Sequence, residues 1–179
     1  MPLRLIHMGD NQQRQGDWTE RPEIVAAHHL ASHDGVITIE EALACGFTRD
    51  QIRRRIDRGL WVRLARGVFL SLEHPLGDAA RIRATAAAHS AVIDRTSAAW
   101  WHGLLHEAPG QVTASLPRTT RAGSGCTVDA DLKRRTFPSE DVTRLRGIPV
   151  TGTALSILAP PRPSTTGSPF STECSRRTW

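Results

Sequence analysis

The sequence lacks several features that would place it in a membrane or a secreted class. It has no run of about 18 consecutive apolar residues, so no membrane-spanning helix is expected. Its first residues, MPLRLIHMGDNQQRQGDW, contain neither a long apolar segment nor a small-residue cleavage site, which argues against secretion. The three cysteines are far apart and have no CxxC spacing, which indicates reduced thiols. We therefore expect a cytoplasmic protein.

The common catalytic and nucleotide-binding motifs are also missing. The chain has no Gly-x-Ser-x-Gly, no P-loop and no GxGxxG, so we expect neither an enzyme nor a cofactor. Lysine is almost absent, because only Lys133 among the 23 basic residues is a lysine. An arginine-favouring genome would produce the same bias. The position of the arginines is therefore more informative than their number.

The positive charge is concentrated in one short segment. Residues 49–66 hold seven arginines against Asp50 and Asp57, which leaves a net charge of +5. The whole chain of 179 residues has the same net charge of +5 with histidine neutral. A local basic surface of this kind is the electrostatic footprint of a DNA-binding protein.

Three helices are predicted around the start of this segment. The second and third open with capping boxes, in which a side chain and a backbone amide satisfy each other's hydrogen bonds. These boxes are Thr38 with Glu41 and Thr48 with Gln51. The turn between them, Cys45-Gly46-Phe47, is short and contains glycine, as is typical of a helix-turn-helix. The predicted helices span residues 22–33, 38–44 and 48–58.

A hairpin is predicted directly after the third helix. Residues 61–64 and 68–70 have the composition of two strands around Ala65-Arg66-Gly67, so they predict a wing. On the third helix, Ile52 and Ile56 face the core together with Phe47 and Leu60. The opposite face is predicted to contact base edges in the major groove, and it carries Gln51, Arg54 and Arg58. The residues predicted to neutralise phosphates are Arg53, Arg55, Arg63 and Arg66. The alternative is an ordinary solvated charged face.

The chain as a whole is predicted to be α+β. After the winged helix, an Ala-rich helix is expected from Asp78 to about Ser90, and a short helix capped by Thr96 or Ser97 follows. Strands are expected at residues 111–116, 126–128, 134–137 and 148–150, and an apolar helix at residues 153–158. Pro160-Pro161 stops this last helix. The predicted parts are a disordered lead-in (1–20), a winged helix-turn-helix DNA-binding domain (21–73), a small α+β second domain (76–159) and a disordered, low-complexity tail (160–179).

Two short patterns could bind metal ions. His29 and His33 are spaced i, i+4 on a predicted helix, a geometry able to bind Zn²⁺, with Cys45 as a further donor. No supporting ligand spacing accompanies them, so ordinary helix histidines are favoured and no metal site is predicted. Asp131-Leu132-Lys133, with Asp129 upstream, is the D-x-K triplet of Mg²⁺-dependent nucleases. Such a site also needs a further acid, usually upstream on a neighbouring strand, and none is evident, so a charged strand edge or turn is favoured.

Four segments of the chain resemble one known family. They are GVITIEEALACGFTRDQIRRRIDRGLWVRLARGVFL, TSAAWWHGLL, VTASLP and EDVTRLRGIPVTGTALSIL. From about Ile24 to Leu158 the chain resembles transcriptional regulators related to the AbiEi-type antitoxins of abortive-infection, type IV toxin–antitoxin systems. The resemblance implies that the N-terminal domain binds double-stranded operator DNA and represses its own operon, and that the protein counteracts a nucleotidyltransferase-type toxin. At Asp94-Arg95 the chain departs from relatives that often have a histidine.

Two rival functions remain open from the sequence. A related architecture joins the same N-terminal half to a Vsr-like PD-(D/E)xK endonuclease domain, and this chain ends where that domain would begin. The protein is then a truncated relative of such a nuclease, or an active one that uses Asp131 and Lys133. In the other rival reading, the winged helix contacts another protein. We favour the DNA-binding regulator, which would bind a palindromic operator as a homodimer or cooperative pair.

Overall fold

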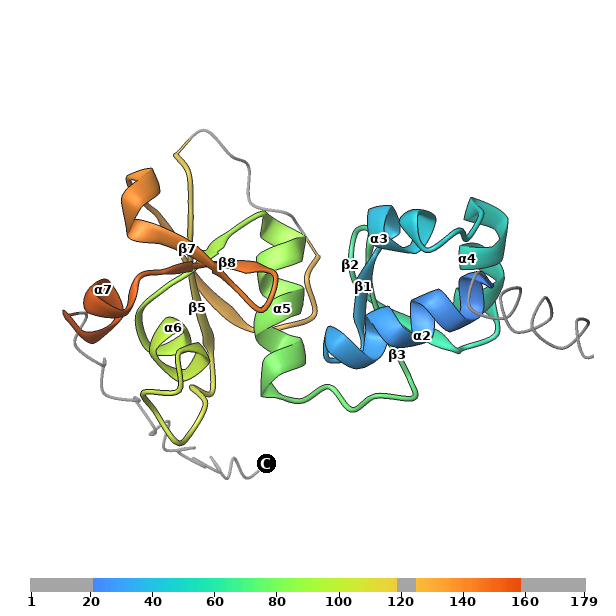
Figure 1. The fold of residues 1–179 in the computed structure, drawn as a ribbon, viewed down its shortest axis with the longest axis horizontal. Coiled ribbons are helices and arrows are strands. Elements are labelled where there is room, and N and C mark those ends of the chain that lie inside the picture. Colours follow the sequence, from blue (N-terminus) through green and yellow to red (C-terminus); the bar gives the residue numbers. More distant parts are fainter. Residues whose placement is uncertain (1–20, 119–124, 159–179) are drawn as a thin grey trace, which may run out of the picture.

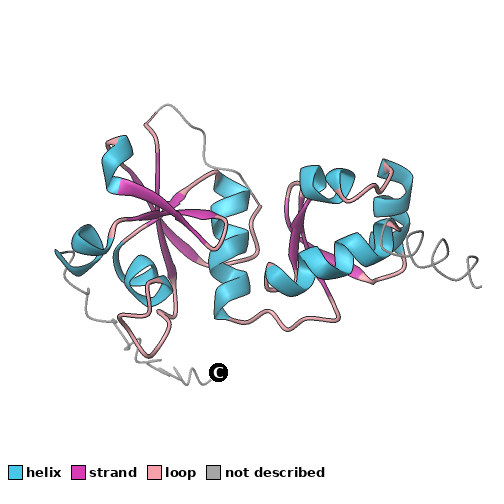
Figure 2. Ribbon diagram, viewed as in Figure 1, coloured by secondary structure: helices cyan, strands magenta, loops and turns pink. Residues whose placement is uncertain are grey.

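The computed structural model describes residues 21–118 and 125–158, which form two α+β parts with separate sheets (Figures 1 and 2). The predictions for the lead-in (1–20) and the tail (160–179) lie outside the described residues. The division at residues 73–76 stays a prediction. Within the described segments, no helix is long and apolar enough to cross a membrane.

The N-terminal part is the predicted winged helix-turn-helix. Both capping boxes are present: the Thr38 hydroxyl accepts the amide hydrogen of Glu41 at 3.2 Å, and the Gln51 side-chain oxygen accepts that of Thr48 at 2.7 Å. Each box satisfies donors that a helix start leaves unpaired. The elements are α2 (Pro22–Ser32), β1 (Val36–Thr38), α3 (Ile39–Ala44), α4 (Arg49–Asp57), β2 (Trp61–Ala65) and β3 (Val68–Ser71).

An antiparallel three-stranded sheet, in the order β1-β3-β2, closes this part. Strand β1 was not predicted, because three residues are too short for an alternating pattern. It forms through long-range pairing, with Val36 opposite Leu70. Ile52 is buried as expected, and Ile56 packs only partly. The prediction that Leu60 joins the core is wrong: Leu60 lies in the turn after α4 and is 45% exposed.

The C-terminal part is a five-stranded mixed sheet in the order β6-β5-β4-β8-β7. Strand pairs β4–β8 and β5–β6 are parallel, whereas β4–β5 and β7–β8 are antiparallel. The sequence expectation of a small α+β second part is therefore confirmed. Its elements are α5 (Asp78–His89), β4 (Val92–Ile93), α6 (Arg95–Trp101), β5 (Val112–Leu116), β6 (Ala130–Arg134), η1 (Ser139–Asp141), β7 (Val142–Leu145), β8 (Ile148–Thr151) and α7 (Thr153–Leu158).

Three local predictions in this part are wrong. Residues 126–128 form no strand, and 127–128 are bends. The expected strand at 134–137 lies instead at 130–134, where it pairs in parallel with β5. Helix α6 begins at Arg95 after Asp94, so neither Thr96 nor Ser97 caps it. The Ser97 hydroxyl instead accepts the backbone N–H of Thr113 at 2.8 Å, which ties α6 to β5.

Helix α5 lies between the two parts and contacts both sheets (Figure 1). Its alanines are small enough for strands from both sides to approach, and one buried cluster runs from Val36 and Leu70 through Ala84 to Ile93. The backbone N–H of Thr127 donates to the Leu64 carbonyl at 2.8 Å, which adds a direct link between the parts. The N-terminal part, which contains the basic helix α4, is therefore packed against the second part.

Candidate nucleic-acid interface

The face of α4 opposite its buried isoleucine is the candidate interface. Arg54 and Arg58 are exposed and Gln51 is half-buried. The three side chains line one hollow of about 180 Å³ next to α2. The structure therefore brings together the three residues predicted to contact base edges.

Two hydrogen bonds orient this face. Gln51 uses its side-chain oxygen in the capping box, so its amide nitrogen is the group left to face a base edge. Arg54 donates from Nε to the carbonyl of Asp50 at 3.3 Å. This bond directs the guanidinium along the helix and engages neither terminal nitrogen. Terminal guanidinium nitrogens are the donors that read guanine in the major groove.

Arg55 differs from the other predicted phosphate contacts. Its guanidinium lies 4.5 Å from the Phe47 ring centroid and 5.6 Å from that of Trp61, and its Nη2 atom is 3.6 Å from the Glu23 carboxylate. Cation–π contacts of this kind contribute about 0.5–2 kcal/mol each. Arg55 thus holds α4 against α2 and β2, a role that the sequence analysis missed. Its position three residues after the buried Ile52 was the available signal.

The remaining arginines extend outward from α4 and the wing. Arg53 is 3.8 Å from Asp57, but its side chain is 82% exposed, so this ion pair is weak and leaves Arg53 able to exchange partners. Arg63 lies on β2 with its guanidinium 5.7 Å from the Phe69 ring centroid. Arg66 is exposed in the turn of the wing. Their contacts with phosphates stay predictions.

The D-x-K triplet lies in β6, and its acidic residue is engaged. Asp131 forms an ion pair with Arg95, and the same guanidinium is 3.0 Å from the Asp94 carboxylate. A cation therefore already neutralises the Asp131 carboxylate, which a nuclease of this kind would need to hold Mg²⁺. Asp129 accepts a hydrogen bond from Gln111 at 3.0 Å. This arrangement favours a structural ion-pair network over a nuclease site.

The structure also shows what surrounds Trp101 and the histidine pair of α2. Trp101 is 1% exposed and belongs to the core. His29 and His33 lie beside Glu41 of α3, whereas Cys45 is outside that group. Burial lowers the pKa of His29, and the neighbouring His33 lowers it further. Glu41 was not considered as a partner, since only the reversal of the chain at β1 places it there.

The exposed basic helix and the wing define a winged-helix type of regulator with an attached α+β part. Two family models agree with this class. One is described as "Transcriptional regulator, AbiEi antitoxin" and matches residues 26–71; the other is described as "AbiEi antitoxin C-terminal domain" and matches residues 80–164. The chain therefore belongs to the AbiEi antitoxin family of transcriptional regulators.

Solved structures similar to this chain include the RV2827C protein of Mycobacterium tuberculosis. The match has 23% sequence identity and a TM-score of 0.42, and it covers 70% of this chain. The chain spans about half of that protein, 47% of its length. No curated protein matches the sequence at a significant level.

Proposed function

We propose that the protein is an antitoxin-like, DNA-binding regulator that represses its own operon in the cytoplasm without catalysing a reaction. The observation that carries this proposal is the single outward face of α4, on which Gln51, Arg54 and Arg58 lie together. Membership of a transcriptional-regulator family supports it.

In the proposed mode of binding, α4 enters the major groove of double-stranded operator DNA. Gln51, Arg54 and Arg58 contact base edges, where a bidentate arginine–guanine pair discriminates by about 1–3 kcal/mol. Arg53, Arg63 and Arg66 neutralise phosphates. Arg55 adds positive charge nearby, while its main role is to fix the angle of α4.

Two further partners belong to the proposal. A palindromic operator requires two copies of α4, so the protein binds it as a homodimer. The C-terminal part is the surface for a nucleotidyltransferase-type toxin, by analogy with the family whose model matches residues 80–164.

Fluorescence anisotropy tests the proposal directly. The protein is titrated against its own upstream promoter duplex and a scrambled duplex, at two salt concentrations. We expect tighter binding to the promoter and weaker binding to both duplexes at higher salt, because phosphate contacts release counterions. No binding at low salt would refute the proposal and favour a protein-interaction module.

The variant Arg54→Ala should reduce sequence preference. We expect operator affinity to fall by about 1–3 kcal/mol while affinity for scrambled DNA falls much less, since one base-specific contact is lost. The measurement is the ratio of the two dissociation constants. Arg53→Ala is the matched control on the same helix, where both affinities should fall alike. Equal losses for both duplexes with Arg54→Ala would show that Arg54 does not read bases.

The variant Arg66→Ala should weaken binding to all sequences alike. Arg66 lies at the tip of the wing, so its loss removes one phosphate contact and no base contact. We expect the slope of log Kobs against log[salt] to become shallower by about one unit. The check is an anisotropy series over several salt concentrations with both duplexes. An unchanged slope would remove the wing tip from the interface.

A further inference from the structure

Three potential metal ligands meet between α2 and α3. His29 and His33 lie one turn apart on α2, and Glu41 lies on α3. One donor atom from each of the three residues lies within 4.8 Å of the others. The sequence offered only the two histidines. The third donor arrives because the chain reverses after α2 and β1 leads directly into α3.

Hydrogen bonds engage one ring nitrogen of His33 and leave the other for a metal ion. Its Nδ1 atom is 2.8 Å from the backbone carbonyl of His29 and 2.9 Å from the Ser32 hydroxyl. With the proton on Nδ1 donated to that carbonyl, the Nε2 atom carries a free lone pair. A hydrogen bond from the second ring nitrogen to a carbonyl is the usual support of a metal-bound histidine.

His29 has a buried ring nitrogen that lacks a hydrogen bond. Its Nε2 atom makes none with any residue that the structure describes, although the Glu41 carboxylate is 3.4 Å away. The rings of His29 and His33 stack with centroids 3.9 Å apart and planes 9° from parallel. Two positively charged rings would repel each other in this arrangement. The stacked planes also direct their in-plane lone pairs side by side, so both rings can bind one ion only after the His29 ring turns out of the stack.

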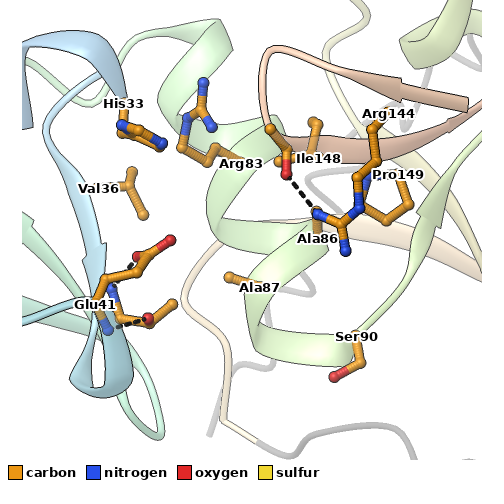
Figure 3. Close-up of a pocket in the computed structure, with 12 residues that line it drawn as sticks. His33, Val36, Glu41, Arg83, Ala86, Ala87, Ser90, Arg144, Ile148 and Pro149 are labelled. Atoms are coloured by element: carbon orange, nitrogen blue, oxygen red, sulfur yellow. Dashed lines mark hydrogen bonds between the residues drawn. The ribbon is translucent and has the colours of Figure 1, made fainter. Parts of the chain in front are cut away.

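Glu41 can serve the capping box and a cation together. Its Oε2 atom accepts the N–H of Thr38 at 2.8 Å. A carboxylate has about four lone-pair directions, so acceptor capacity remains for a metal ion. Glu41 and His33 line the same cavity of about 390 Å³, on the wall that the N-terminal part forms (Figure 3).

Arg83 is the positively charged side chain that could repel a metal ion here, and it is already paired with a carboxylate. The Arg83 guanidinium lines this cavity, but it pairs with the Asp34 carboxylate at 3.1 Å and donates to the Arg146 carbonyl at 2.9 Å. The group His29, His33 and Glu41 therefore offers two neutral nitrogens and one carboxylate. Two histidines and a glutamate are an established protein ligand set for Zn²⁺, with the fourth position left for water or another ligand.

We propose that His29, His33 and Glu41 bind one divalent transition-metal ion of the Zn²⁺ class. The ion joins α2 to α3 and so fixes the two helices that precede α4. Its open position faces the cavity between the two parts of the protein. The proposal does not depend on DNA binding and is tested without DNA.

The test is isothermal titration of the full chain with Zn²⁺, kept reduced, with three variants. His33→Gln removes a ligand. Glu41→Gln removes the anionic ligand, yet glutamine also forms a capping box, so α3 keeps its start. His28→Gln is the matched control, because His28 is exposed on the same helix and outside the group. Circular dichroism confirms that each variant is folded.

We expect one Zn²⁺ ion per chain and a higher melting temperature in its presence, because a ligand that binds only the folded state stabilises it. His33→Gln and Glu41→Gln should each weaken binding at least as much as the roughly 10- to 100-fold that a lost supporting contact costs. His28→Gln should bind like the parent protein. With Co²⁺ as the probe, the spectrum should show no thiolate-to-metal band. Unchanged affinity in both ligand variants, or a thiolate band, would overturn the proposal.

Discussion

Replacing Trp101 with alanine should lower the free energy of unfolding by about 3–5 kcal/mol. The side chain is 1% exposed and lies in the core that both parts of the protein share. Its loss removes buried apolar surface and leaves a cavity that the surrounding sheet can fill only in part. The indole Nε1–H also donates to the Leu145 carbonyl at 3.0 Å, so the variant leaves that carbonyl without its partner.

Two arginines also make cation–π contacts with the Trp101 indole. The guanidinium groups of Arg83 and Arg146 lie 5.6 Å and 5.1 Å from the Trp101 ring centroid. Because Arg83 also pairs with Asp34 of the N-terminal part, the Trp101→Ala cavity should weaken the contact between the two parts.

Urea unfolding followed by circular dichroism measures the effect of Trp101→Ala. The matched control is Trp100→Ala, since Trp100 is the neighbouring indole on the same helix and is only partly buried. We expect a clearly smaller loss of stability for Trp100→Ala. Equal losses in the two variants would contradict the assignment of Trp101 as the central core residue.

Replacing Arg95 with methionine should also lower the free energy of unfolding, by about 3–5 kcal/mol, as when one partner of a buried ion pair is removed. The Arg95 side chain is 14% exposed, and the Asp94 side chain that it pairs with is 4% exposed. Without the guanidinium, the Asp94 carboxylate keeps the Ser115 hydroxyl, 2.6 Å away, but loses its cation. Asp131 is 34% exposed, so water can replace part of what it loses.

A second variant separates charge from packing in this network. The double variant Asp94→Asn with Arg95→Met removes the stranded carboxylate, so it should recover part of the stability that Arg95→Met loses. Arg53→Met is the surface control, because its exposed pair with Asp57 contributes at most about 0.5 kcal/mol. Urea unfolding measures all three variants. A double variant no more stable than Arg95→Met would show that the buried charge is not the cause.

The parts of the fold that the sequence could predict are those set by neighbours along the chain. The two capping boxes, the glycine-containing turn and the hairpin around Arg66 depend on residues a few positions apart, and the structure has each of them. The strands that were missed, β1, β4 and β7, are two to four residues long. Strands β1 and β4 exist only through pairing with distant strands, whereas β7 pairs with the adjacent β8. Short strands carry too little alternation to be recognised before their partners are known.

The same distinction applies to the candidate sites. The outward face of α4 follows from helical spacing, so Gln51, Arg54 and Arg58 could be grouped in advance. The contact of Arg55 with Trp61, the pairing of Arg95 with Asp131 and the meeting of Glu41 with the histidines of α2 all join separate elements. Spacing along one helix indicates at most that Arg55 lies beside the buried face of α4. The partners in all three contacts depend on how the elements pack.

Because of the alanines of α5, the N-terminal and C-terminal parts of this protein cannot each be exchanged independently for those of a relative. Ala84 and Ala86 are buried in the cluster that contains residues from both sheets. A larger side chain at either position would displace a sheet and not merely a neighbouring side chain. A chimera that combines this winged helix with another C-terminal half would therefore need to transfer α5 and its facing strands as one unit.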